Sequence, residues 1–247
     1  MLKWVLAGIA SIFIILYLIF MVLVPLHTSN FNFSYLFSVL HHWQVMNASM
    51  IAFISSWLLF FAAVYRDRKQ KSYEEKSARA FLAGALSGIS HYLEECIEYL
   101  SEAYKCSEAR SQSVKYSISL PEPVLDEAFY KEDFSNGIKY LSKNVGYHLA
   151  DILTDLQIIR SRIKDKKRAY EGDTSYELPI NIECDMKRVA ELSVKVNHLY
   201  PFSRSRENTQ LLELKLDAKE VHSALVSMEI YDHDFPNLFE MIKRMDY

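Results

Sequence analysis

The feature that most constrains this chain is a long stretch without formal charge. After Lys3, the next Asp, Glu, Lys or Arg is Arg66, so residues 4–65 carry no charged side chain. A soluble domain exposes most of its surface to water and rarely forgoes charged residues over such a length. Residues 66–247 hold all 31 acidic side chains and 27 of the 28 basic ones. We therefore divide the chain into two domains, 1–65 and 66–247.

Two segments of the uncharged domain are long enough to cross a membrane. Residues 4–24 are almost wholly apolar, and residues 47–65 are more polar but uncharged. A helix rises about 1.5 Å per residue, so about 20 residues cross the hydrocarbon core. No small-x-small cleavage site follows the first segment, which favours an anchor over a cleaved signal peptide. The sequence predicts an N-terminal two-helix transmembrane hairpin with spans 4–24 and 47–65.

The basic residues predict the orientation of this hairpin. One lysine precedes the first span, four basic residues follow the second, and the connecting loop 25–46 has no Lys or Arg. By the positive-inside rule, both termini lie in the cytoplasm and the loop lies outside. The residues after the second span would then lie at the cytoplasmic membrane surface, and they are Arg66, Arg68, Lys69 and Lys71.

The loop itself carries aromatic residues at every second position. Phe31, Phe33, Tyr35, Phe37 and Val39 occupy alternate positions, and the polar residues Asn32, Ser34 and Ser38 lie between them. A period of two is typical of a strand-like segment, or of an interfacial segment with one aromatic edge. We expect this segment to lie on the outer membrane surface, in preference to capturing a ligand.

The charged domain begins with a predicted helix from about residue 66 to about residue 110. Apolar residues alternate spacings of four and three, which is a heptad pattern over about three heptads. Its members are Leu82, Leu86, Ile89, Leu93, Cys96, Leu100 and Ala103. Ser107 would come next and is polar, so we expect the buried seam to end before it.

The rest of the charged domain predicts further helices. A second long helix, 135–170, would bury Ile138, Leu141, Val145, His148, Ile152, Leu156, Ile159 and Ile163, with Gly172 as its C-cap. Shorter helices are expected at 182–199, 207–230 and 236–245, with Pro201 separating the first two. Weak strand signals occur at 117–120 and 178–182. We predict an all-α chain: a transmembrane hairpin followed by a cytoplasmic bundle of four or five helices, joined to the membrane by a continuous helix.

The sequence carries no strong catalytic motif. There is no GxxxxGK[ST], GxGxxG, GxSxG or HExxH, and six glycines leave little room for a phosphate-binding loop. The three cysteines form no CxxC pair, which disfavours a disulfide framework and a zinc site. Residues 66–247 have a net charge of 27 − 31 = −4, whereas dedicated nucleic-acid binders are usually basic. We expect no enzymatic activity, no metal and no cofactor.

One short segment has a catalytic resemblance. Residues 143–148, Lys-Asn-Val-Gly-Tyr-His, resemble the Arg-polar-x-x-x-His motif of the helical HEPN ribonucleases. The resemblance covers six residues and would imply a membrane-tethered ribonuclease. Lys143 replaces the arginine of the motif, and an ammonium does not reproduce the planar guanidinium. His148 also falls on the predicted buried stripe, where a histidine of the core is the ordinary explanation.

Two further groups of residues are candidates for contacts. A partner-docking cluster, for a protein or nucleic-acid regulator, would comprise Arg160, Arg162, Lys164, Lys166, Lys167 and Arg168. The alternative is a favourable interaction with the helix dipole together with solubility. In the second span, small residues occur four apart at Ala48, Ala52 and Ser56, next to Ser55. Such a face allows close helix contact in lipid, either with the first span or between protomers that line a pore.

The layout as a whole resembles the two-span membrane effectors of bacterial anti-phage systems, such as those paired with retrons or nucleotide second messengers. The resemblance implies a homo-oligomeric, non-enzymatic effector in the bacterial inner membrane, which perturbs the lipid bilayer when it is released or assembled. A membrane-tethered scaffold or signalling adaptor is the alternative, and a tethered HEPN-like ribonuclease is the third possibility.

Overall fold

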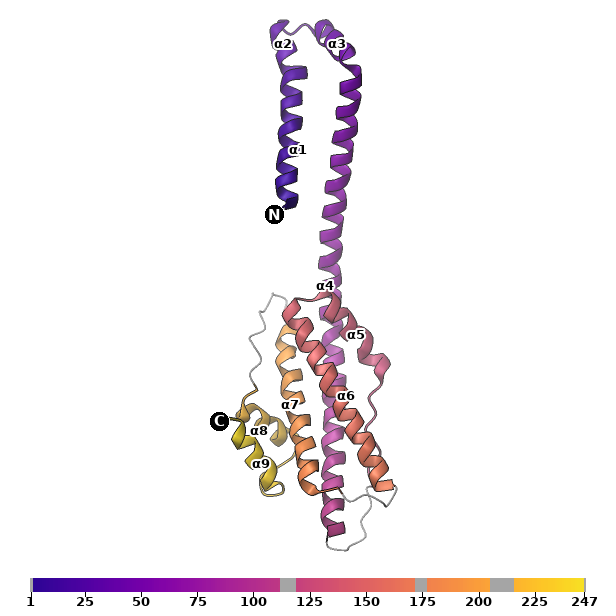
Figure 1. Cartoon of the computed structure of the whole chain (residues 1–247), viewed down its shortest axis with the longest axis vertical. Helices are drawn as coiled ribbons and strands as arrows, with labels where there is room; N and C mark the ends of the chain where they lie inside the picture. The colour runs from indigo at the N-terminus through magenta and orange to yellow at the C-terminus, as the bar shows by residue number, and fades with distance from the viewer. Residues whose placement is uncertain (1, 112–118, 172–176, 205–215, 247) are drawn as a thin grey trace. The chain divides into compact units, whose positions relative to one another are not determined.

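The computed structural model describes residues 2–111, 119–171, 177–204 and 216–246 (Figure 1). All regular secondary structure in these ranges is helical, which confirms the all-α prediction. The chain forms two units, Met1–Ser72 and Tyr73–Tyr247. The strand signal at 178–182 is wrong, because α7 (Pro179–Arg204) starts there. The signal at 117–120 lies mostly outside the described residues.

The first unit begins with an apolar helix that continues through a proline. It comprises α1 (Leu2–Leu18), a π-helical turn η1 (Ile19–Leu23) and α2 (Val24–Thr28). A proline inside a helix has no N–H and clashes with the preceding turn. The wider π-turn before Pro25, in which the Val24 N–H donates to the Ile19 carbonyl, is a common local adjustment to such a disruption.

Within the described ranges, two helices are long and apolar enough to cross a membrane. One includes Ser11–Thr28, and the other is α4 (Gln44–Ser111), which holds the second apolar segment. Large apolar side chains on both are exposed, for example Phe20 at 64% and Leu59 at 71%.

The segment between these helices is not strand-like. Residues Phe33–His42 form helix α3, so the strand-like alternative is wrong, whereas the interfacial placement stays a prediction. Asn32 caps this helix, because its side-chain oxygen accepts a hydrogen bond from the Ser34 N–H at 3.0 Å. The same segment also has a second pattern, of helical spacing, which overlaps the alternating aromatic residues. Its members are Phe33, Leu36, Phe37 and Leu40.

Helix α4 is the centre of the second unit. All seven residues of the predicted heptad seam are 0% exposed, which confirms the seam. Its predicted end is wrong, because Ser107 is only 1% exposed and continues the buried face. The Ser107 hydroxyl donates to the Glu177 carbonyl oxygen at 2.6 Å, which satisfies the polar group inside the core. Tyr92, Tyr99 and Cys106 are also buried, so α4 is covered on more than one side.

The predicted helix 135–170 is two helices, and the single-helix prediction is wrong. Helix α5 (Glu127–Tyr140) and helix α6 (Lys143–Glu171) pack against each other across a short turn. Gly146 allows this packing, because a Cβ there would lie 3.3 Å from the Ile138 carbonyl oxygen. Ile138 is 40% exposed and not part of the buried stripe. The other apolar residues predicted for the stripe are buried, and they are Leu141, Val145, Ile152, Leu156, Ile159 and Ile163.

The remaining helices cover α4 and α6. Helix α7 packs against α6, and α8 (Ala218–Ser227) and α9 (Pro236–Lys243) pack against α7, before a short 3₁₀ turn, η2 (Arg244–Asp246). The predicted separation at Pro201 is wrong, because α7 continues to Arg204. The predicted helix 207–230 begins outside the described residues, and within them it corresponds to α8. The predicted C-cap Gly172 also lies outside the described residues.

Candidate functional site

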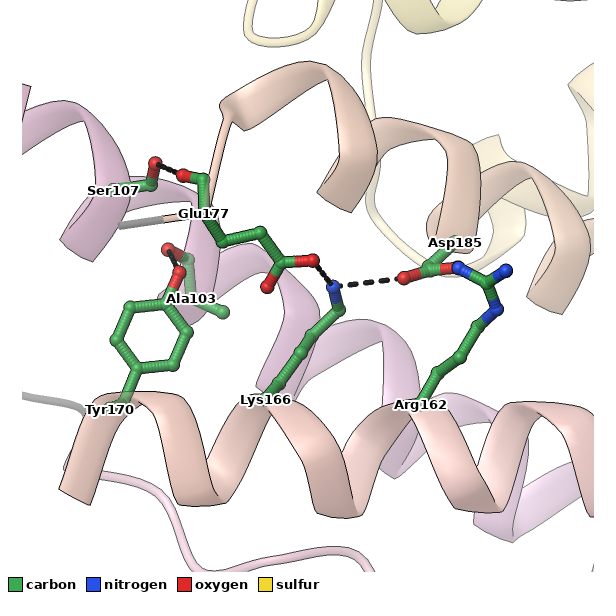
Figure 2. A network of polar contacts seen from close by, with 7 residues as sticks. All are labelled: Ala103, Ser107, Arg162, Lys166, Tyr170, Glu177 and Asp185. Atoms are coloured by element: carbon green, nitrogen blue, oxygen red, sulfur yellow. Dashed lines mark hydrogen bonds and ion pairs between the residues drawn. The ribbon is translucent and has the colours of Figure 1, made fainter. Parts of the chain in front are cut away.

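The predicted basic cluster lies on α6, and its most buried member is Lys166. This side chain is 3% exposed, and its ammonium forms ion pairs with the carboxylates of Glu177 and Asp185 (Figure 2). The distance from Lys166 Nζ to Asp185 Oδ2 is 2.9 Å. Arg162, one turn before Lys166, contacts the other oxygen of Asp185 at 3.0 Å. Two cations of α6 therefore hold one carboxylate of α7.

Two hydroxyl groups attach this ion network to α4. Ser107 binds the Glu177 carbonyl oxygen, and the Tyr170 hydroxyl donates to the Ala103 carbonyl oxygen at 3.1 Å (Figure 2). Burial raises the pKa of Tyr170 well above its usual value, so the hydroxyl stays protonated and remains a donor. The network thus joins α4, α6 and the start of α7 at one place.

This geometry changes the interpretation of the basic cluster. The prediction that six basic residues present one docking surface is wrong for Lys166, which is buried. Lys167 pairs with Glu122 at 3.0 Å, and Arg168 lies 3.9 Å from Asp165. Arg160 is half-buried and has interactions of its own. Lys164 is an exposed cation that has no ion pair within the described part of the chain. Docking of a regulator at the exposed members stays a prediction.

A groove of about 760 Å³ runs beside the ion network, between α6 and the start of α7. Arg162, Lys166 and Asp185 line it together with exposed apolar side chains, among them Leu178 at 52%. Its charged lining residues include both signs, since Asp165 and Glu177 also contribute. The groove therefore suits an amphipathic protein segment better than a strongly charged ligand.

The small-residue face of the second span points away from the first span. Ala48, Ala52, Ser55 and Ser56 are exposed. A different face of α4 is partly covered, with Asn47, Met50, Ile54, Trp57, Phe61 and Val64 as its half-buried residues. The Tyr17 hydroxyl of α1 donates to the side-chain oxygen of Asn47 at 2.6 Å, so this second face is the one turned toward α1. The possibility that the small residues pack against the first span is not supported.

The other predicted site residues are exposed or half-buried. Arg66, Arg68, Lys69 and Lys71 are exposed on α4, and their role at a membrane surface stays a prediction. Lys143 is exposed in the first turn of α6, and His148 is half-buried, so its predicted place on the buried stripe is only partly correct. Among the described residues, no cluster of histidine, cysteine or carboxylate side chains could hold a metal ion.

Sequence reasoning missed a fully buried carboxyl group. Glu183 on α7 is 0% exposed, and neither of its oxygens has a hydrogen bond of normal geometry within the described part of the chain. Burial raises the pKa of Glu183, while the side chain of Asn237 and the backbone of Leu238, in the first turn of α9, act in the opposite direction. A glutamate among helical neighbours gives no sequence signal of burial, because charged residues are usually at the surface.

Glu183→Gln is expected to stabilise the 73–247 unit near neutral pH. The folded-state pKa of Glu183 is raised, so folding favours the protonated carboxyl, and its contribution to stability falls as pH rises above about 4.5. The glutamine side chain is similar in shape and has no charge to desolvate. The melting temperature of the variant should exceed that of the wild type at pH 7–8, and the difference should shrink toward pH 4. A pH-independent difference would contradict this explanation.

Comparisons with protein-family models, curated proteins and solved structures find no match for this chain.

Proposed function

We propose that this chain is a membrane-anchored effector without enzymatic activity, whose copies assemble in the bacterial inner membrane and perturb it. In this proposal, residues 4–24 and 47–65 form a two-span hairpin with both termini in the cytoplasm. The bundle from residue 66 onward receives the signal that permits or prevents assembly. The setting in anti-phage defence rests on the similarity of layout alone.

The exposed apolar surface supports the placement in a membrane. Burying a large apolar side chain such as Phe20 or Leu59 gains about 1.5–3 kcal/mol relative to leaving it in water. Many such side chains are exposed on α1 and on the first half of α4. Lipid is the environment in which all of them are covered at once.

The single observation that carries the assembly step is the exposed small-residue face of the second span. Two spans cannot enclose a water path, so an effector of this design must bring several copies together or distort the bilayer. Small side chains allow close approach of helices in lipid, where no hydrophobic effect drives association. Because Ala48, Ala52 and Ser56 are not used against α1, they are available to a second protomer.

A second small-residue face on α4, which contains glycines, supports self-association outside the membrane. Ala80, Gly84 and Gly88 are four residues apart, and no heavy atom lies within 4 Å of the place where a Gly84 Cβ would be. A glycine inside a helix costs about 0.5–1 kcal/mol relative to alanine. Nothing within the described chain uses this open space, so contact with another copy is a physical reason for it.

The test is the membrane potential of cells that express the protein. Strong induction of the wild type without other genes of its locus is expected to depolarise the cell. Ala52→Leu should abolish depolarisation, because leucine prevents close approach while making the span more apolar, so that insertion still succeeds.

Leu58→Phe is the matched control for this experiment. It adds bulk about 200° around the helix from Ser56, on an exposed part of α4 that lies outside the small-residue face. This variant should insert and depolarise as the wild type does. Normal potential and growth under strong induction of the wild type would contradict the effector proposal.

A membrane-tethered scaffold is the second candidate, and the groove between α6 and α7 favours it. The groove offers Ile158 and Leu178 as exposed apolar contacts beside the Arg162 guanidinium, a combination that suits an amphipathic helix of a partner. A scaffold would leave the membrane potential unchanged, so the experiment above distinguishes the two functions.

A further inference from the structure

Helix α3 has two different long sides. Successive residues of an α-helix are 100° apart, which places Phe33, Leu36, Phe37 and Leu40 on one side. Ser34, Ser38, His41 and His42 lie on the other side. No residue of this helix is an Asp, Glu, Lys or Arg.

Only one edge of the apolar side is used within the protein. Helix α3 packs against η1 and α2, and Leu36 is 8% exposed while Leu40 is half-buried. Phe33 and Phe37, one turn apart, are 62% and 67% exposed. The two phenylalanines therefore form an aromatic edge that nothing in the described chain covers.

The neighbouring residues carry the same exposed aromatic surface past both ends of the helix. Phe31 is 67% exposed in the turn before α3, and Trp43 is 49% exposed directly after it. Trp is enriched where a membrane meets water, because its ring is apolar and its N–H is polar. The surface is continuous along the chain with α2 before it and with α4 after it, the two helices that hold the apolar segments.

We propose that α3 lies in the outer membrane–water interface, with Phe33 and Phe37 among the acyl chains and Ser34 and Ser38 facing water. This inference rests on the proposed two-span topology, and it gives the loop segment, expected on the outer membrane surface, a helical form with a defined side toward the lipid. An uncharged helix has no electrostatic attraction to anionic headgroups, so apolar insertion alone holds α3 in place. In this respect it differs from the basic segment Arg66–Lys71, which anionic lipid would attract.

The first test is cysteine accessibility from outside the cell. Phe37→Cys and Ser38→Cys are adjacent variants, one on the apolar side of α3 and one on its polar side. A membrane-impermeant maleimide is added to spheroplasts that express each full-length variant. Ser38→Cys is expected to react, and Phe37→Cys to react about tenfold or more slowly, because apolar surroundings disfavour the reactive thiolate. Phe33→Cys and Ser34→Cys repeat the comparison one turn earlier, so that a local distortion at one position does not decide the result.

The outcomes separate this inference from the topology on which it rests. Equal fast labelling of both members of each pair in spheroplasts would overturn the interfacial placement and leave the external loop intact. Labelling of both members only after permeabilisation, at equal rates, would overturn the topology and the interfacial placement together. Labelling of neither member in permeabilised membranes would show that α3 is buried and would also overturn the inference.

The second test uses the purified full chain in vesicles of phosphatidylcholine, with or without anionic phosphatidylglycerol. The ratio of the Ser38→Cys and Phe37→Cys labelling rates is expected to be the same in both lipids and unchanged by salt. A protection of Phe37→Cys that appears only with anionic lipid, or that is lost in high salt, would contradict insertion driven by apolar contact.

Discussion

Lys166→Ala is expected to destabilise the 73–247 unit by up to about 3–5 kcal/mol, because it leaves Glu177 without its cation and the buried carboxylate of Asp185 with only Arg162. The side chain of Lys166 is 3% exposed and its ammonium pairs with Glu177 and Asp185, and the Asp185 side chain is itself only 5% exposed. Urea unfolding of the purified full chain, followed by circular dichroism, measures the loss. In a unit of this size, each kcal/mol corresponds to about 2–4 °C in melting temperature.

Lys164→Ala is the matched control, since Lys164 is an exposed cation on the same helix. Surface substitutions of this kind usually change stability by about 0.5 kcal/mol or less. Adding Asp185→Asn to Lys166→Ala should recover part of the loss, because it removes a buried charge that no longer has its lysine. Equal stabilities of the two single variants would show that Lys166 is solvated in the protein and that the ion network is not a buried one.

Leu93→Ala is expected to cost about 2–5 kcal/mol, because it opens a cavity in the middle of the core. Leu93 on α4 is 0% exposed and belongs to the hydrophobic core of the second unit. The melting temperature of the purified chain and its level in cells should both fall.

Phe81→Ala, three turns earlier on α4, is the control for this prediction. Phe81 is 62% exposed, so the truncation removes a larger side chain from the same helix without opening a cavity in the core. Its melting curve should stay close to that of the wild type. If Leu93→Ala melts as the wild type does, the heptad face does not hold the bundle together.

The sequence by itself determined those features that depend on a local repeat. The seven apolar residues of the seam from Leu82 to Ala103 recur at helical spacing, and all are buried. A repeat of this length makes one face of the helix apolar, and that face is stable only when it packs away from water. The two apolar segments were equally visible, since length and absence of charge are properties of the chain itself.

The tertiary structure decided where helices end and which polar groups are buried. Residues 135–170 have a continuous helical pattern, but close packing of α5 on α6 at Gly146 requires a turn that no periodicity reveals. Helix α3 is a different case, because the Asn32 cap that favours it over the period of two is local in the sequence.

Lys166 and Ala52 show the same limit for the candidate sites. In the sequence, Lys166 is one of six cations in nine positions, and only the approach of Asp185 from α7 and of Glu177 makes it a buried structural residue. Ala52 has the small side chain of a packing face, but the partner of that face depends on the rotation of α4 relative to α1, which the bond from Tyr17 to Asn47 reports. A repeat in the sequence predicts that a helix has an apolar or small-residue face. Which surface packs against that face depends on contacts between residues far apart in the chain.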